Sequence, residues 1–331
     1  MELNLWNSNQ LLQEWLNKHS QNVLKCDFDF DVVNPSSNSL IDTISEKLGV
    51  ERNCIALSAG ISELIFSVFS APLWNNVYTF TPEFGLYLKC IRNSMYKNAV
   101  KIIEMQSVHT LDKLLEEHET TQDDLLCISS PNWFSGERMT YEEILDLLCV
   151  FQGTIVIDEA YVNYADEPDM LTRLAETNDR IILFRSFSKG WFVSGLRIGY
   201  MISRKYAPKF RDEIILPHSV STPSMRIAQN LLNDSYLMRC FRATRNDVIN
   251  TREYLKAELK DLDGCTCFQS ESNFLTMLLD DTFEQNKEKL AKAFGAKVMD
   301  TVMDGRMSLK YWISSMENAE NMVRLLKSIK E

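Results

Sequence analysis

The sequence predicts an α/β fold, in which a mainly parallel sheet with helices on both faces is followed by a smaller α+β domain. Short apolar runs rich in β-branched residues alternate with segments of helical periodicity, which is typical of parallel sheets covered by helices. From about residue 203 the pattern changes to long helical segments followed by further strand-like runs. At 331 residues the chain is long enough for one large domain and a smaller partner.

Seven apolar runs in the first part of the chain predict the strands of the larger sheet. They span residues 53–57, 76–80, 100–104, 124–129, 154–158, 180–185 and 198–202. Helices are predicted between most of them, at 60–70, 83–94, 109–118 and 140–151. Alternation of this kind predicts a sheet that is buried on both faces.

The C-terminal part predicts the smaller domain. A long charged helix over 236–262 precedes strand-like runs at 265–269, 273–279 and 307–313. The last helix is predicted over 317–330, because it has an acidic residue near its start and lysines near its end, the order that a helix dipole favours.

Composition and charge narrow the range of partners. The net charge is −11 and the sequence pI is near 5.0, so the overall field disfavours binding to nucleic acid or to an anionic membrane. The first residues lack the basic start and apolar core of a signal peptide, and no apolar stretch reaches the roughly 20 residues of a spanning helix. These features predict a cytoplasmic enzyme.

The cysteines do not predict a metal site. Eight of them are scattered along the chain without the paired spacing of zinc ligands, and only Cys265 and Cys267 are close together. On a strand these two side chains share one face, which favours small buried hydrophobic residues over a redox or metal site.

One predicted strand ends in an acid. Residues 153–161 read Gly-Thr-Ile-Val-Ile-Asp-Glu-Ala-Tyr, with Asp158 at the end of the apolar run and Tyr161 three residues later. Open α/β sheets bind ligands at the carboxyl ends of their strands. An acid placed there can pair with a pyridine nitrogen and keep that ring protonated.

A lysine lies among small hydroxylated residues in the next segment. Residues 186–200 read Ser-Phe-Ser-Lys-Gly-Trp-Phe-Val-Ser-Gly-Leu-Arg-Ile-Gly-Tyr, which places Arg197 eight positions after Lys189. A lysine amine forms a Schiff base with an aldehyde, and an arginine binds phosphate oxygens bidentately. Pyridoxal 5′-phosphate (PLP) carries both groups.

Together these motifs resemble those of a known enzyme family. Asp158-Glu-Ala-Tyr161, Ser186-Phe-Ser-Lys189 and Gly195-Leu-Arg197-Ile-Gly-Tyr200, in this order and spacing, resemble the fold-type I PLP enzymes. The resemblance is strongest to the histidinol-phosphate aminotransferase-like branch of the class I/II aminotransferases, and it extends from about residue 38 to the C-terminus.

The resemblance implies the aspartate aminotransferase-like, PLP-dependent transferase fold. Residues 1–37 would then join the small domain, residues 38–215 would form the large cofactor-binding domain, and residues 216–331 would form the small C-terminal domain. Members of the family build each active site at a dimer interface, so a homodimer is expected.

The resemblance also implies roles for the chemical groups. Lys189 would form the Schiff base with PLP and then move the substrate α-proton, Asp158 would pair with the ring nitrogen, and Tyr161 would donate to the ring's phenolic oxygen.

The phosphate would be held at the turn that follows the first strand. This turn opens a helix whose backbone N–H groups can point at an anion, although a plain loop-to-helix junction is an equal alternative. The aromatic ring over the cofactor would be that of Phe84, for which an ordinary core position is the alternative. The expected phosphate contacts are Gly60, Ile61, Ser62, Ser186, Ser188 and Arg197.

Three departures from the family pattern lie on the substrate side. Where the family has Asn-Pro-Thr-Gly, this chain has Trp133 in place of the asparagine. Either the loop shifts so that the preceding Asn132 contacts the ring, which we favour, or the cofactor loses this hydrogen bond and Trp133 lines the substrate pocket instead. Where the family has a carboxylate-binding arginine, this chain has Lys310, with Arg306 as a substitute. The tyrosine that crosses the family's dimer has no equivalent, Val32 being nearest.

These features predict a PLP-dependent aminotransferase that acts on a small amino acid or amine and on a 2-oxo acid or aldehyde. The rebuilt substrate side favours a specialised metabolic enzyme over histidine biosynthesis itself. Two alternatives stay open: a decarboxylase resembling threonine-phosphate decarboxylase, and a non-catalytic binding protein that keeps the PLP fold.

Overall fold

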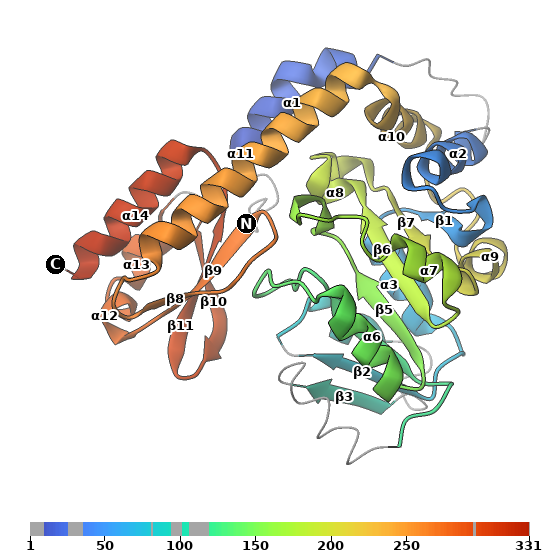
Figure 1. Ribbon diagram of the computed structural model, residues 1–331, viewed down its shortest axis with the longest axis horizontal. Coiled ribbons are helices and arrows are strands. Elements are labelled where there is room, and N and C mark those ends of the chain that lie inside the picture. Colours follow the sequence, from blue (N-terminus) through green and yellow to red (C-terminus); the bar gives the residue numbers. More distant parts are fainter. Residues whose placement is uncertain are drawn as a thin grey trace.

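The computed structural model contains two sheets that are connected by a long helix (Figure 1). The structure describes residues 10–25, 36–80, 82–93, 101–105, 119–293 and 296–330. The predicted helix at 109–118 and the position of Val32 lie outside these residues, as does most of the segment 1–37.

The larger sheet has the seven strands that the sequence predicts. Their order is β1-β7-β6-β5-β4-β2-β3, and β7 is antiparallel to both of its neighbours while the other pairs are parallel. Two predicted ranges, 76–80 and 154–158, coincide with the observed strands. The strands are β1 (Ile55–Ser58), β2 (Asn76–Phe80), β3 (Lys101–Met105), β4 (Leu125–Ser129), β5 (Thr154–Asp158), β6 (Ile181–Ser186) and β7 (Gly199–Ile202).

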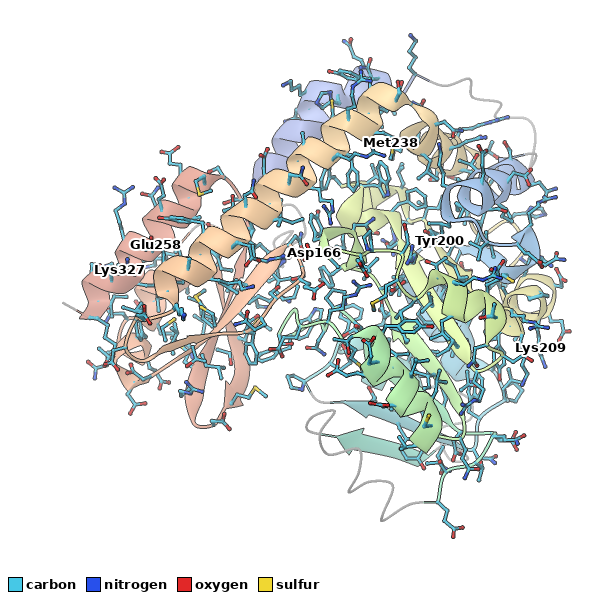
Figure 2. All side chains as sticks on the ribbon, in the orientation of Figure 1. Asp166, Tyr200, Lys209, Met238, Glu258 and Lys327 are labelled. Carbon is cyan, nitrogen blue, oxygen red and sulfur yellow. The ribbon has the colours of Figure 1, made fainter. Side chains whose placement is uncertain are left out.

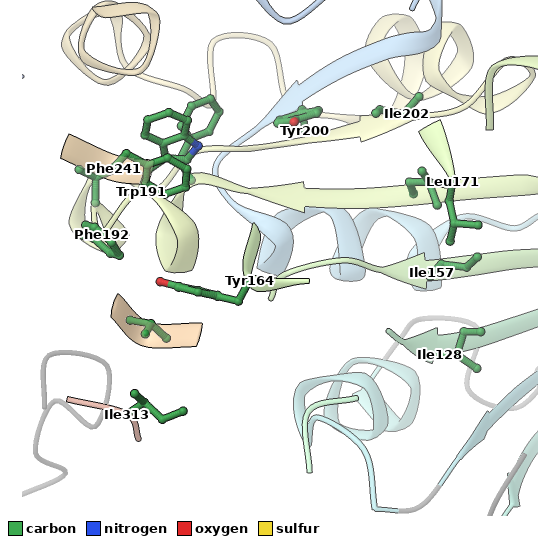
Figure 3. Close-up of a cluster of buried hydrophobic side chains, with 14 of the residues drawn as sticks. Ile128, Ile157, Tyr164, Leu171, Trp191, Phe192, Tyr200, Ile202, Phe241 and Ile313 are labelled. Carbon is green, nitrogen blue, oxygen red and sulfur yellow. The ribbon is translucent and has the colours of Figure 1, made fainter. Parts of the chain in front are cut away.

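The larger sheet is covered on both faces. Every residue of β4, β5 and β6 is buried. Alternate residues of β5 point to opposite faces, so Ile155 and Ile157 belong to one hydrophobic cluster and Val156 to the other. Figure 3 shows the first cluster, in which Ile157 lies near Ile128 of the neighbouring strand.

Helices from different parts of the chain cover the two faces. The face with Ile157 packs against α2, α6 and α7, and the face with Val156 packs against α3, α4 and α9. The bounds of these helices are α2 (Ser36–Leu48), α3 (Ile61–Ser70), α4 (Leu86–Asn93), α6 (Tyr141–Val150), α7 (Thr172–Thr177) and α9 (Tyr206–Lys209).

Local sequence signals mark where α6 begins. Thr140 accepts a hydrogen bond from the backbone N–H of Glu143, and the carboxylate of Glu143 accepts one from the backbone N–H of Thr140. A reciprocal capping box of this kind stabilises a helix end by about 1 kcal/mol.

The smaller sheet is antiparallel throughout, with the order β10-β11-β9-β8. Three of its strands were predicted, and β10 was missed. This strand lies at the edge of the sheet and pairs with β11. Its register shifts between Val298 and Val302, and the shift interrupts the regular alternation of side chains by which a strand is predicted. The strands are β8 (Cys265–Cys267), β9 (Phe274–Leu279), β10 (Ala296–Met303) and β11 (Arg306–Trp312).

Helix α11 (Ser235–Leu259) runs from the larger sheet to the smaller one (Figure 1). Helix α1 (Gln10–Val23) packs along it, and α10 (Thr222–Asn233) packs on α2. Near the far end of α11, Glu258 and Lys327 of α14 (Met316–Lys330) form an ion pair of 2.8 Å (Figure 2). The division of the chain at residues 37 and 215 stays a prediction.

Short helices complete the structure. They are the 3₁₀ helices Arg52–Cys54, Val162–Tyr164 and Ser194–Leu196, the π-helix Phe210–Ile214, and the α-helices α8 (Phe187–Gly190), α12 (Asp281–Glu284) and α13 (Lys287–Ala291). Within the described part of the chain, no helix is both long and apolar enough to span a membrane, and no group of acidic, histidine and cysteine side chains forms a metal site.

Candidate active site

A cavity of about 490 Å³ opens at the carboxyl ends of the central strands. Strands β4, β5 and β6 each contribute their last residue to its wall, and the start of α3 and the segment 186–197 complete it. Most of the predicted site residues are brought together here, as the topology of an open α/β sheet requires. The lining residues are Ile61, Ser62, Phe84, Ser129, Trp133, Asp158, Ala160, Tyr161, Ser186, Ser188, Lys189, Ser194, Gly195 and Arg197.

Asp158 is the last residue of β5 and is 4% exposed. One carboxylate oxygen accepts a hydrogen bond of 2.6 Å from the hydroxyl of Tyr87, and the other accepts one of 2.9 Å from the backbone N–H of Ala160. Burial raises the pKa of Asp158 to about 6, although these two hydrogen bonds and the charge of Lys189 oppose the shift. The carboxylate is therefore fixed in position and favours a cationic partner.

Lys189 lies on the short helix α8, whose start is capped by Ser186. The Ser186 hydroxyl oxygen accepts a 2.9 Å hydrogen bond from the backbone N–H of Ser188, and the Tyr164 hydroxyl donates one of 3.0 Å to the carbonyl of Lys189. These contacts hold the lysine backbone. Just after it, the ring of Trp191 stacks on Phe241 of α11 with 4.2 Å between centroids (Figure 3).

The amine of Lys189 has a lowered pKa. Burial is the main cause, the charge of Arg197 adds to it and that of Asp158 opposes it, so that the pKa falls from 10.5 to about 7. Its Nζ lies 5.8 Å from the centre of the Tyr161 ring. A substantial fraction of this amine is therefore neutral and nucleophilic at neutral pH.

Gly60 and Arg197 meet beside the start of α3, where Ile61, Ser62 and Arg197 line the cavity. Gly60 has a φ of +84°, and a Cβ atom at this position would lie 2.6 Å from Nη2 of Arg197. The guanidinium is held by a 3.1 Å hydrogen bond from Nη1 to the carbonyl of Ser194. The positive φ favours glycine here, and the missing Cβ leaves room for the arginine to lie close to the start of α3.

Glu83 is a buried carboxylate that sequence reasoning missed. It accepts hydrogen bonds from the hydroxyl and backbone N–H of Ser129, at 2.5 and 2.9 Å, and from the backbone N–H of Phe84 at 2.8 Å. Burial raises its pKa to about 7, and the charge of Asp158 adds to the shift. It fixes two lining residues, and its place just after a predicted strand was the signal available.

Tyr87 was also missed, although it donates directly to Asp158. It lies on α4 three residues after Phe84, and its ring packs edge-on against Phe84 with 6.2 Å between centroids. Burial raises its pKa well above the usual range, so the hydroxyl stays protonated and donates. The helical spacing indicates a shared face, but it does not indicate contact with a residue 71 positions away.

The structure separates the roles of Asn132 and Trp133. The side-chain oxygen of Asn132 accepts from the backbone N–H groups of Phe134 and Ser135, at 2.9 and 3.0 Å, so it stabilises its own loop. Trp133 lines the cavity and Asn132 is not among the described lining residues. The geometry favours Trp133 as the residue of this loop that borders a ligand.

Lys310 lies behind the cavity wall. It belongs to β11 and is fully buried, and its Nζ donates a hydrogen bond to the carbonyl of Trp133. Arg306, the predicted substitute, is bonded elsewhere, with a 2.8 Å hydrogen bond from its Nη1 to the hydroxyl of Thr266.

An ion pair supports the strands that carry the site. Nε of Arg185, on β6, lies 2.8 Å from the carboxylate of Glu159, which follows Asp158 directly, and both side chains are buried. A second carboxylate, of Asp169, lies 2.6 Å from Nη1 of the same arginine. The pair therefore links the end of β5 to β6. Removing either partner would leave a buried charge uncompensated, which is strongly unfavourable.

Comparisons with known proteins agree with the geometry. The family model for aminotransferase class I and II matches residues 5–313. A histidinol-phosphate aminotransferase of Chlorobium limicola is 26% identical over 303 residues, which cover 87% of this chain and 81% of that protein.

Two solved structures have the same fold. The histidinol-phosphate aminotransferase of Sinorhizobium meliloti, in complex with pyridoxal-5′-phosphate, has a TM-score of 0.74 at 16% identity and covers 97% of this chain and 86% of its own. The L-threonine-O-3-phosphate decarboxylase of Porphyromonas gingivalis has a TM-score of 0.71 at 18% identity, and the match covers 95% of this chain and 96% of that chain. The predicted aspartate aminotransferase-like fold is confirmed.

Proposed function

Because this chain belongs to the class I and II aminotransferase family, we propose that it uses PLP, bound as a Schiff base at Lys189, to transfer an amino group between a small amino acid or amine and a 2-oxo acid or aldehyde. The single observation that carries this proposal is that Lys189, Asp158 and Arg197 line one cavity. Their charges suit the amine, the ring-nitrogen partner and the phosphate partner of one ligand.

The residues present fit PLP. The side chain of Arg197 lies against the glycine at position 60, where a Cβ would lie 2.6 Å from its Nη2, and the N-terminus of α3 adds backbone donors. The cavity is large enough for a substituted pyridine, and the carboxylate of Asp158 is buried at its inner wall. Ser62, Ser186 and Ser188 add hydroxyl groups to the lining at the phosphate end of this proposed site.

Each protein group has a distinct task in this proposal. When bound, PLP supplies an aldehyde for condensation with amines and a ring that accepts electrons. Asp158 would supply the negative charge that pairs with the ring nitrogen, and Tyr87 holds that carboxylate in place. Lys189 takes and returns the substrate α-proton at Nζ, for which a pKa near neutrality is well suited. Tyr161 would donate to the ring's phenolic oxygen, the ring of Phe84 would lie over the cofactor, and Trp133 would border the substrate.

The lowered pKa of Lys189 predicts how PLP capture depends on pH. Below pH 7 the amine is protonated and cannot attack an aldehyde, so the rate of capture by cofactor-free protein should rise with pH and level off above about 7. Stopped-flow absorbance over a pH series measures this rate. A rate that keeps rising beyond about pH 9 would instead indicate a lysine with the pKa of a solvated side chain.

A half-reaction screen tests the proposed function. PLP-loaded protein is mixed with single amino donors, without an acceptor, and the visible spectrum and carbon dioxide release are recorded. Formation of pyridoxamine phosphate without carbon dioxide supports amino transfer. Carbon dioxide release without pyridoxamine phosphate supports the decarboxylase alternative, for which the fold match to the Porphyromonas enzyme is the supporting observation.

We further propose that the protein acts as a homodimer and that it is cytoplasmic. The homodimer is what membership of the family implies, and the acidic composition is compatible with the second statement. The non-catalytic alternative is disfavoured, because the curated relatives that match most of the chain are aminotransferases.

A further inference from the structure

The amine of Lys310 is enclosed by aromatic rings. Its Nζ lies 3.4 Å from the ring centre of Phe274, 4.6 Å from that of Trp133, 5.1 Å from that of Trp312 and 5.9 Å from that of Tyr161. The side chain is fully buried, and the amine donates a hydrogen bond to the carbonyl of Trp133. A lysine from the smaller sheet thus touches a loop of the larger domain.

Lys310 contacts two of the three aromatic rings in the described cavity lining, those of Trp133 and Tyr161. Trp133 lines the cavity and receives the hydrogen bond. Tyr161 also lines it, and its ring packs edge-on against Phe274, with 5.2 Å between centroids. On its other side Trp133 lies near Phe84, with 6.3 Å between the two ring centres. The substrate side of the cavity is therefore an aromatic wall with Lys310 behind it.

This arrangement gives a substrate carboxylate no evident partner in the described lining. The cationic residues among the described lining side chains are Lys189 and Arg197, and the proposed cofactor uses both. Lys310 is not among the described lining residues, and its amine lies against the rings of Trp133 and Tyr161, which are. Burial, with a contribution from the charge of Lys189, lowers its pKa well below the ordinary value, which weakens it further as an anion receptor. A buried carboxylate without a paired cation is unfavourable.

We infer that Lys310 is a positioning residue that holds Trp133 across the cavity, and that the resulting wall recognises an aromatic or apolar group of the amino donor without preference for an α-carboxylate. This inference rests on the proposed function, since it concerns the substrate side of the same cavity. In the transfer, the donor's nitrogen passes by way of the cofactor to the oxo acceptor, and the donor carbon leaves as the corresponding aldehyde or oxo acid.

Matched pairs of donors test the specificity. Phenethylamine and phenylalanine differ only in the carboxylate, as do tyramine and tyrosine. Equilibrium dissociation constants with PLP-loaded protein, from titration of the visible spectrum, should show that each amine binds at least as tightly as its amino acid. If each amino acid binds about tenfold or more tightly than its amine, the wall contains a carboxylate receptor and the inference is wrong.

The variant Lys310→Met tests the positioning role, because methionine keeps the length of the side chain and removes the donor. We expect both members of each pair to bind about tenfold more weakly, which is the loss expected for one hydrogen bond, while the affinity for PLP stays unchanged. A loss confined to phenylalanine and tyrosine would show direct carboxylate binding and overturn the inference. Lys297→Met is the matched control, because Lys297 is the exposed register partner of Lys310 on β10.

A double-mutant cycle then asks whether Lys310 acts through Trp133. In Trp133→Ala the ring is absent, so adding Lys310→Met should weaken donor binding little further. Additive losses would show that the two residues act separately and would contradict the inference. Failure of the inference is distinguishable from failure of the proposed function. If the proposed function fails, no PLP adduct is found at Lys189 after borohydride reduction of the protein.

Discussion

Lys189→Ala is expected to abolish amino transfer and to leave PLP bound without a covalent link. The proposed mechanism assigns both condensation with the cofactor and movement of the substrate proton to this amine, so the rate should fall by at least about 10⁴-fold. Residual affinity for PLP should remain, because Arg197 at Gly60 and the carboxylate of Asp158 are untouched. Steady-state rates and equilibrium dialysis with PLP measure the two effects separately.

An exposed lysine provides the control for this substitution. Lys205 lies outside the cavity lining, and Lys205→Ala should leave both turnover and covalent PLP unchanged. If Lys189→Ala retained turnover within about tenfold of the unmodified protein, the amine at position 189 would not be the catalytic group.

Asp158→Asn is expected to have the second largest effect, a loss of about 10² to 10³-fold in the rate of amino transfer. Asparagine has nearly the same shape, and its oxygen can still accept a hydrogen bond from Tyr87 or Ala160. It has no charge, however, so the ring nitrogen would lose the partner that keeps it protonated. The loss should appear in the rate of the half-reaction, with a smaller effect on PLP affinity.

The matched control for that substitution is Asp146→Asn, since Asp146 is exposed on α6. It should change neither the rate nor the affinity. An Asp158→Asn protein that reacts as fast as its parent would show that the buried charge is not needed, and the proposed role of the strand-end acid would have to be abandoned.

Features encoded by local pattern could be predicted from the sequence. The seven strands of the larger sheet are short, mainly apolar runs, and in the fully buried strands β4, β5 and β6 the polar residues lie at the strand ends. Asp158 and Lys189 were found because each interrupts such a pattern at a strand end or next to one. Parallel topology then brings the ends of adjacent strands to one edge, as the shared cavity demonstrates.

Features that depend on packing between distant segments could not be predicted. Nothing local to Tyr87 indicates that its hydroxyl will reach Asp158, and nothing local to Lys310 indicates that four rings will surround its amine. The expectation that Asn132 contacts the ring came from the family's asparagine one position later, with Trp133 as the alternative. In the structure this amide caps its own loop, which leaves Trp133 at the cavity.

The strand β10 illustrates a related limit. It pairs on one side only, and a register shift interrupts its alternation, so its local pattern is weak. Its position follows from its pairing with β11, which is itself buried and was predicted. An edge strand of this kind can be predicted only when the position of its partner strand is known.

The most direct test of the account is the chemical state of Lys189 in protein supplied with PLP. Borohydride reduction, proteolysis and mass spectrometry locate any covalent PLP on the chain. We predict one phosphopyridoxyl group on the peptide that contains Lys189, and its loss in Lys189→Ala. A protein that stays colourless with PLP, or that carries the label on other lysines and not on this one, would contradict the account.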